Sequence, residues 1–281
     1  MSTGTLDPGS SVGTEGGAAG LVPPGAGVPA PGARPSGGSA ALRLLRVLGL
    51  PVLLALVVFG VYRYVTTAQL DSIEARLLDP SRLVDQTLQH LKLVGVSTLV
   101  VVALAVPAGV LATRPSLRRV VPAIVGLGNI AQGVPSLGVV VLFAVSLGSI
   151  GFTPAIFALV LYAFLPVLRN TIVGLQQVDR FVVESARGMG MSRLTVLRRI
   201  ELPLAVPVVL AGIRTAAVIN VGTATIAALI NAGGLGETIY QGLVLNRVTA
   251  TVVGAILAGV LALLIDHLGS LLEQALRPKG L

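Results

Sequence analysis

The chain has 281 residues, of which 54% are hydrophobic and only 11% are charged, and its mean hydropathy is +0.90. A soluble domain carries about twice that share of charged residues, so the composition indicates an integral membrane protein. The net charge of +8 comes from basic residues scattered between apolar runs, which argues against a nucleic-acid-binding face. The chain has no cysteine, which excludes disulfides, thiolate metal sites and cysteine nucleophiles.

The N-terminal part of the chain combines a polar tail with one apolar run. The first 40 residues contain eleven Gly and six Pro and few large apolar side chains, so residues 1–42 are predicted to be a disordered cytoplasmic tail. Residues 43–68 are predicted to form a peripheral transmembrane helix, because the apolar run within them is long enough to cross a bilayer. This run begins too far from Met1 and is too long to favour a cleaved signal peptide.

Residues 69–92 are polar and mixed in charge, with leucines at helical spacing. They are predicted to form an extracytoplasmic segment that lies along the membrane surface, with His90 as a solvated interfacial residue. The next run, residues 93–112, is uncharged and is followed at once by arginines at 114, 118 and 119. Because basic residues favour the cytoplasmic side, this span is predicted to run from outside to inside.

The 49 residues between Arg119 and Arg169 contain no Asp, Glu, Lys or Arg, a length that suits two crossings. The first crossing is predicted to be broken at 133–136, where the sequence is Gly-Val-Pro-Ser, because proline removes a backbone donor and clashes with the preceding turn. Residues 148–154 contain two glycines and a proline and are predicted to form the outer turn.

Two further spans are predicted at residues 203–230 and 248–265. The segment 231–242 between them is rich in glycine and is predicted to be a re-entrant or outer loop. The whole chain then has six spans with both termini in the cytoplasm, one peripheral and five in a core at 93–276. This arrangement places 15 of the 20 Lys and Arg residues on the cytoplasmic side.

One polar, arginine-bearing segment interrupts the core on its cytoplasmic side. Residues 179–188 are predicted to form a short helix, Gly190 a turn with positive φ, and Ser192 the N-cap of a second helix that ends at Ile200. Pro203 suits the start of the following span. Two short helices joined by a glycine turn make a projection that can seat in a socket.

The cytoplasmic loop at 176–203 carries a spaced motif. A Glu-Ser-Ala triplet is followed by a Gly six residues after the Glu, and by Ile-x-Leu-Pro ten residues after that Gly. The matching positions are Glu184, Ser185, Ala186, Gly190, Ile200, Leu202 and Pro203. This pattern resembles the EAA loop of permease subunits of binding-protein-dependent ABC importers, and only Ser185 departs from it.

The resemblance implies that the loop is a coupling helix that docks into a cleft of a separate ATP-hydrolysing subunit, with Glu184 near the contact. The alternative is an amphipathic helix pair that lies on the inner leaflet. That alternative requires neither the spacing of the Glu and Gly nor the Leu-Pro ending.

Three further stretches resemble permeases for osmoprotectants such as glycine betaine, carnitine and choline. They are Gln-Gly-Val-Pro-Ser-Leu at 132–137, Leu-Tyr-Ala-Phe-Leu-Pro-Val-Leu-Arg-Asn-Thr at 161–171, and Asn-Ala-Gly-Gly-Leu-Gly at 231–236. The similarity covers about 83–276. It implies an all-α integral membrane protein with a type I ABC importer (MetI-like) permease core of five transmembrane helices, to which one N-terminal transmembrane helix is added.

Two other functions stay open at this point. Permeases for an amino acid such as methionine share the glycine-rich loop and the EAA pattern, so the resemblance also allows such a cargo. An ion-coupled secondary transporter is the alternative of another class; it would need intramembrane carboxylates or inverted repeats, and neither is visible.

The sequence offers no aromatic cage for a quaternary ammonium, since it has no Trp and its Tyr and Phe residues are dispersed. Selectivity then rests mainly with a separate binding protein, as the family implies. The polar residues expected to line the translocation pathway are Asn129, Gln132, Ser136, Asn220, Thr223 and Thr225. For each of them, a hydrogen bond between helices is the alternative role.

The chain lacks the Gly-x-x-x-x-Gly-Lys-Ser/Thr phosphate loop, so it is expected to have no ATPase site, no cofactor and no metal of its own. ATP is expected to bind a partner subunit. The resemblance implies as partners an ABC ATPase, an extracytoplasmic substrate-binding protein and a second permease subunit, identical or paralogous, in the lipid of a bacterial plasma membrane. No nucleic acid is expected.

Overall fold

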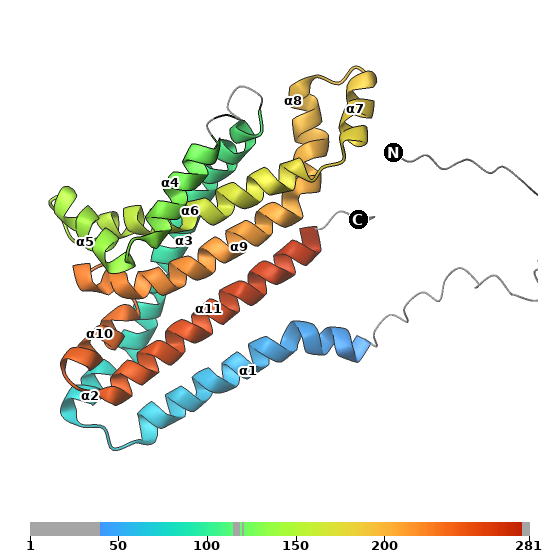
Figure 1. Ribbon diagram of the computed structural model, residues 1–281. Helices are drawn as coiled ribbons and strands as arrows, with labels where there is room; N and C mark the ends of the chain where they lie inside the picture. The colour runs from blue at the N-terminus through green and yellow to red at the C-terminus, as the bar shows by residue number, and fades with distance from the viewer. Residues whose placement is uncertain (1–39, 115–118, 120, 277–281) are drawn as a thin grey trace, which may run out of the picture.

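The computed structural model describes residues 40–276 apart from 115–118 and 120, so nearly all of the predicted tail lies outside it. The described chain is entirely helical, and its long helices run side by side between two ends of the molecule (Figure 1). The helices are α1 (Ala40–Thr67), α2 (Ser72–Leu77), α3 (Pro80–Ala112), α4 (Val121–Gly133), α5 (Ser136–Ser146), α6 (Phe152–Gln176), α7 (Arg180–Gly188), α8 (Arg193–Val196), α9 (Leu202–Ala227), α10 (Gly236–Val244) and α11 (Val248–Leu276).

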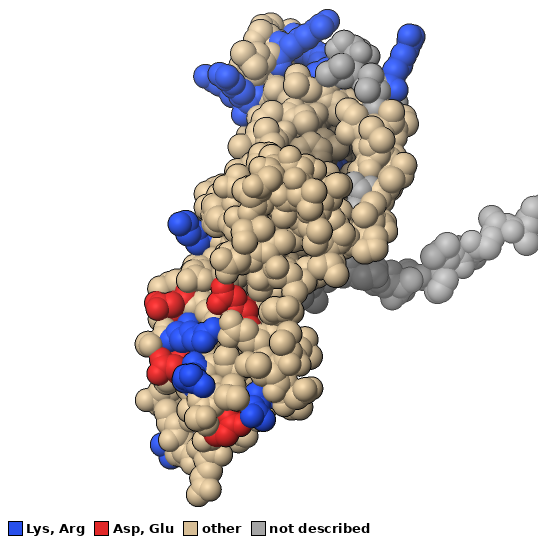
Figure 2. Space-filling model, turned by 90° about the vertical axis from the view of Figure 1, so that its left-hand side faces the viewer, with Lys and Arg blue, Asp and Glu red and all other residues tan. Residues whose placement is uncertain are grey.

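Five helices are long and apolar enough to cross a membrane. They are α1, α3, α6, α11 and the continuous helix Arg193–Ile230, in which a π-helical turn joins α8 to α9. The shorter apolar helices α4 and α5 follow one another, at the place where the sequence predicts a broken crossing. Figure 2 shows a broad uncharged surface between the two ends of the molecule. Lys and Arg gather at the end that carries α7 and α8, whereas acidic and basic residues mix toward the other end. The chain is therefore a multi-pass membrane protein.

The segment before the second span differs from the prediction. Residues 80–92 do not lie along the surface as a separate helix, because no helix-breaking residue separates them from the span, and α3 runs unbroken from Pro80 to Ala112. Asp79 caps its start by accepting from the amide N–H groups of Ser81 and Arg82 at 3.0 and 3.3 Å. The Ser81 hydroxyl, together with these amides, holds the pKa of Asp79 below its usual range.

The prediction for His90 was wrong for the same reason. Because residue 90 lies on a helix that faces α9, its ring is fully buried, and Nε2 lies 3.1 Å from the Val221 carbonyl oxygen. A surface helix would have left this ring in water. Leucines at helical spacing fit both arrangements, so periodicity alone could not distinguish them.

The predicted break in the first crossing is confirmed. Helix α4 ends at Gly133, and α5 begins at Ser136 directly after Pro135, whose ring cannot continue an α-helix. The outer turn follows at residues 147–151, where Gly148 and Gly151 have φ of 59° and 106°. The value at Gly151 is accessible without strain only to glycine, and the left-handed value at Gly148 favours glycine.

The glycine-rich segment after α9 is a loop only in its first half. Asn231, Gly233 and Gly234 have positive φ and reverse the chain after a 3₁₀ turn at Ala228–Ile230. From Gly236 the chain forms α10, which packs on α11.

The last helix, α11, extends to Leu276, beyond the predicted end of the span at 265.

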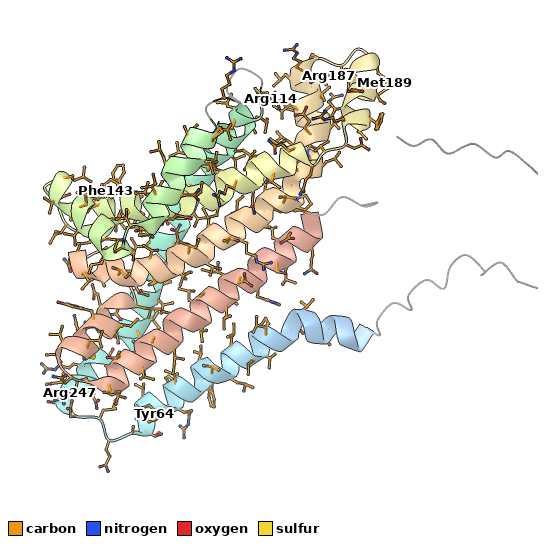
Figure 3. All side chains as sticks on the ribbon, in the orientation of Figure 1. Tyr64, Arg114, Phe143, Arg187, Met189 and Arg247 are labelled. Atoms are coloured by element: carbon orange, nitrogen blue, oxygen red, sulfur yellow. The ribbon has the colours of Figure 1, made fainter. Side chains whose placement is uncertain are left out.

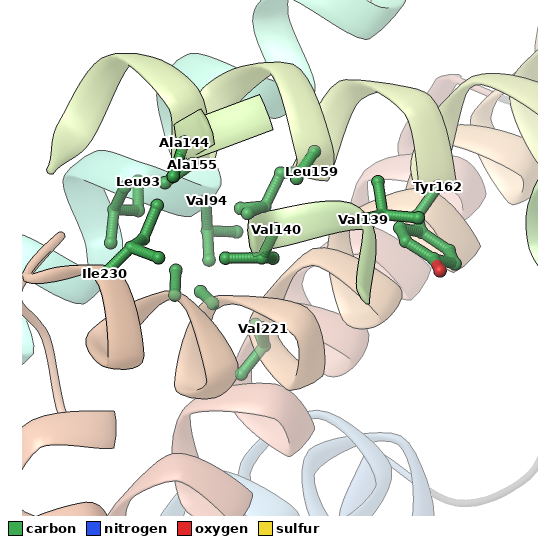
Figure 4. Packing of buried hydrophobic residues seen from close by; sticks show 13 residues of the cluster. Leu93, Val94, Val139, Val140, Ala144, Ala155, Leu159, Tyr162, Val221 and Ile230 are labelled. Carbon is green, nitrogen blue, oxygen red and sulfur yellow. The ribbon is translucent and has the colours of Figure 1, made fainter. Parts of the chain in front are cut away.

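The core of the fold lies where α3, α5, α6 and α9 meet (Figure 4). Small residues let the helices approach closely: a Cβ on Gly109 of α3 would lie 2.6 Å from the Cβ of Thr171 on α6. In contrast, α1 packs chiefly on α11, and only 6% of its most apolar stretch is buried. Helix α1 is thus peripheral to the other crossings.

Candidate functional site

The projection formed by α7 and α8 stands at one end of the molecule, beyond the ends of the long helices (Figure 1). Asp179 caps α7 by accepting from the Phe181 amide at 2.8 Å. After Gly188 the chain turns through Gly190, with φ of 85°, and the Met191 amide donates to the Ala186 carbonyl at 3.2 Å. The predicted helix and glycine turn are therefore present.

The second helix of the projection begins as predicted and ends differently. Ser192 caps it, since its Oγ accepts from the Thr195 amide at 3.3 Å. The helix does not stop at Ile200, however: α8 passes through a π-helical turn, Leu197–Glu201, directly into α9. The wider turn occurs just before Pro203, the residue whose missing N–H and bulky ring disfavour a regular α-helical turn.

Large apolar side chains are uncovered on this otherwise polar projection. Phe181, Met189 and Leu194 are 79%, 72% and 54% exposed. Figure 3 shows Met189 and Arg187 at the end of the molecule opposite Arg247 and Tyr64. Large apolar side chains exposed on a polar projection are typical of a surface that contacts another protein.

The motif residues divide by exposure. The exposed members are Glu184, Ser185, Gly190 and Pro203; Ile200 and Leu202 are half-buried; Ala186 is buried. The buried Ala186 and Val196 lie where α7 packs on α8, so a small residue at 186 lets the two helices approach. The exposed motif residues are available for contact with a partner, except Gly190, whose role is to form the turn.

A cavity of about 540 Å³ lies at the root of the projection. Its lining comes from the ends of α3 and α6, from α7 and from the π turn, and includes Glu184, Arg180 and Arg187. Within it, Arg114 Nη2 and Glu201 Oε2 form an ion pair at 2.7 Å. This pair could not be predicted from the sequence because 87 residues separate its members. The only local signal is a lone Glu next to an apolar run.

Three of the predicted pathway residues lie together at the broken helix. Asn129 is exposed and accepts from the Arg169 guanidinium at 2.6 Å. Gln132, also exposed, donates to the Tyr162 carbonyl at 3.1 Å. Ser136 is half-buried at the first position of α5. The Tyr162 hydroxyl donates to the Val134 carbonyl, so α6 satisfies backbone and side-chain groups at the break.

The other three predicted pathway residues lie on α9 in a different setting. Asn220 is fully buried and donates to Ser97 and Thr98 of α3 at 2.9 and 3.2 Å. Thr223 and Thr225 donate to carbonyls of their own helix. Asn220 thus makes a hydrogen bond between helices, the alternative role considered above, and the pathway role of these three residues stays a prediction.

Comparison with known proteins gives one family. Residues 105–279 match the sequence model described as binding-protein-dependent transport system inner membrane component. The glycine betaine/carnitine/choline transport system permease protein OpuCB of Bacillus subtilis is 39% identical over 196 residues, 70% of this chain and 89% of that protein. The carnitine transport permease protein OpuCB of Listeria monocytogenes is 41% identical over 70% of this chain and 88% of its own length.

Another relative matches a longer part of the chain, and solved structures match its fold. The osmoprotectant import permease protein OsmY of Salmonella typhimurium is 38% identical over 241 residues, 84% of this chain and 98% of that protein. Among solved structures, an inward-facing MetNI methionine ABC transporter matches with a TM-score of 0.62 and 27% identity over 70% of this chain and 97% of that one. A chain of an amino acid ABC transporter, 20% identical with a TM-score of 0.61, covers 74% of this chain and all of that one, and supports the fold alone.

Proposed function

Because the chain belongs to the family of binding-protein-dependent transport system inner membrane components, we propose that it forms the translocation pathway of an ATP-driven importer for an osmoprotectant. The cargo class is that of its relatives, whose names specify glycine betaine, carnitine and choline at 35 to 41% identity. The methionine transporter is 27% identical, which makes an amino-acid cargo the less favoured alternative. An ion-coupled secondary transporter has no support in this family.

The observation that carries the proposal is the α7–α8 projection. It presents Phe181, Met189 and Leu194 outside the region that lipid would cover, and it stands at the end of the molecule where Lys and Arg gather. A cytoplasmic ATPase with a complementary apolar cleft would bury these side chains. Glu184 and Ser185 are exposed beside them, in position to contact the same partner.

The remaining partners follow from what this chain lacks. It has no phosphate loop, so the ATP would bind and react in a separate subunit. It has no aromatic cage, so an extracytoplasmic binding protein would select the solute and deliver it at the end that carries α2 and α10. A second permease subunit would complete the pathway around the broken helix of α4 and α5, in a bacterial plasma membrane with both termini inside.

The proposed mechanism couples ATP binding to a rigid-body transition. Closure of two ATPase subunits would draw the two projections together, and the α8–α9 helix would carry that displacement into the membrane. The Arg114–Glu201 ion pair joins the root of the projection to the end of α3, so α3 would move with it. The pathway would then open toward the binding protein.

Docking of the projection is testable by a triple substitution with a matched control. Phe181, Met189 and Leu194 are replaced by Ser, and Leu245, which is 44% exposed at the other end, is replaced by Ser in the control. We expect the triple variant to insert normally, to lose the co-purified ATPase, and to lose uptake of labelled glycine betaine, carnitine or choline in vesicles. The control is expected to insert normally and to keep the co-purified ATPase. Full retention of the ATPase by the triple variant would contradict the docking role.

A further inference from the structure

Arg169 is a charged residue inside a crossing. It lies on α6, seven residues before the helix ends at Gln176, which is about 10 Å along the axis. Its contact Asn129 is equally deep, eight residues from the start of α4. A charge at such a depth is costly in lipid and is usually retained for a function, next to protein or water.

Two other arginines toward this end of the molecule have acidic partners. Arg114 pairs with Glu201 at 2.7 Å, and Arg214 of α9 pairs with Asp266 of α11 at 2.7 Å. Within the described residues, no Asp or Glu lies within 4.0 Å of the Arg169 guanidinium. Its contact is neutral, the Asn129 Oδ1 at 2.6 Å. The positive charge of Arg169 is thus oriented by the fold and left without a counter-charge there.

The fold fixes the place where Arg169 and Asn129 meet. A Cβ on Gly128 would lie 2.8 Å from Leu165 Cδ1, so the absence of a side chain lets α4 approach α6. Asn129 and Gln132 are one turn apart on α4 and contact Arg169 and the Tyr162 carbonyl, which are two turns apart on α6. The exposed guanidinium therefore continues a polar strip that begins at the broken helix.

We propose that Arg169, oriented by Asn129, binds the carboxylate of the transported solute in the cytoplasmic half of the pathway. This inference depends on the proposed function and goes further by assigning a chemical preference to the permease itself. A guanidinium has five N–H donors in a planar fork that matches a carboxylate, and Asn129 accepts from only one nitrogen. The side-chain NH₂ of Asn129 adds a donor at the same place.

The chemistry separates the proposed cargoes into two groups. Glycine betaine and carnitine carry a carboxylate beside the quaternary ammonium, whereas choline carries a hydroxyl. A fixed cation attracts the first group and repels choline, whose only charge is positive. With no aromatic cage to hold the ammonium, the carboxylate contact stays brief enough for the solute to leave.

The experiment compares uptake of labelled glycine betaine and choline by vesicles that contain the assembled importer. Arg169→Gln removes the charge, Arg169→Lys keeps it without the fork, and Asn129→Asp supplies a carboxylate at nearly constant shape. Arg63→Gln, at an exposed arginine of the peripheral helix α1, is the control. We expect Arg169→Gln and Asn129→Asp to lower the ratio of glycine betaine to choline uptake at least about tenfold, Arg169→Lys to lower it less, and the control to leave it unchanged.

The ratio is decisive because a purely structural role of Arg169 would lower both rates together. An unchanged ratio in Arg169→Gln and Asn129→Asp, whether both rates fall or neither does, overturns the inference and leaves the proposed function intact. If Arg169 instead binds a lipid phosphate, the substitution leaves uptake of both solutes unchanged. The ratio is then also unchanged, and the inference is overturned in the same way. Wild-type vesicles that take up neither solute while hydrolysing ATP overturn the proposed function and this inference with it.

Discussion

At the scale of the residue, the turn of the projection depends on Gly190. Its φ of 85° lies in the left-handed region, where a side chain costs about 1–2 kcal/mol, although among the described residues nothing would touch an added Cβ. We predict that Gly190→Ala lowers ATPase retention and coupled uptake about 5- to 30-fold with normal insertion into the membrane. Immunoblotting of membranes and co-purification measure both effects.

Gly188 provides the matched control for that substitution. It ends α7 with an ordinary helical backbone, and an added Cβ would likewise meet open space among the described residues. Gly188→Ala is expected to behave as wild type. An equal loss in both variants would mean that the projection tolerates no methyl group anywhere, and the conformational explanation for Gly190 would be wrong.

Caps and turns could be predicted from the sequence because they depend only on nearby residues. The cap at Ser192 and the turn at Gly190 depend on neighbours within a few positions, and both are present. The environment of His90 and the pairing of Arg114 with Glu201 depend on which helices pack together. No local pattern contains that information, because the contacting residues are 131 and 87 positions apart.

At the scale of the element, α9 packs on α6 through a glycine. A Cβ on Gly212 would lie 2.5 Å from the Asn170 Cβ, whereas one on Gly222 of the same helix would meet open space among the described residues. We predict that Gly212→Ala destabilises the fold by about 1–3 kcal/mol through overpacking. Gly222→Ala is expected to be neutral or slightly stabilising, because Ala is the better helix former. Thermal unfolding in detergent, followed by size-exclusion chromatography, measures the difference; a larger loss in Gly222→Ala would contradict this packing.

The elements themselves were predictable wherever the sequence contains a strong break. Pro135 and the glycines at 148 and 151 mark real helix ends. Elsewhere the helices are longer than predicted: α3 begins at Pro80, with no helix-breaking residue before the span, and α8 continues through a π turn into α9 despite Pro203. At these points the sequence changes from polar to apolar, but the backbone stays helical. Charged residues are good helix formers, so they extend a helix into water as readily as apolar residues extend it into lipid.

At the scale of the whole molecule, the absence of cysteine makes the orientation directly testable. Ser149 lies in the outer turn and Ser185 on the projection, and both are exposed. We predict that a membrane-impermeant maleimide labels Ser149→Cys in intact cells and labels Ser185→Cys only after permeabilisation. Labelling of Ser185→Cys in intact cells would reverse the topology and remove the proposed contact with a cytoplasmic ATPase.

The continuous helix from Arg193 to Ile230 has a consequence for motion. At 1.5 Å per residue, its 38 residues span about 57 Å, so a tilt of about 10° around the middle displaces each end by about 5 Å. Helix α9 packs against α6, α3 and α11, and we expect the helix to pivot about these contacts. In such a pivot the two arms would move in opposite directions, so pulling together the arms that carry the projections of two subunits would spread their other arms apart.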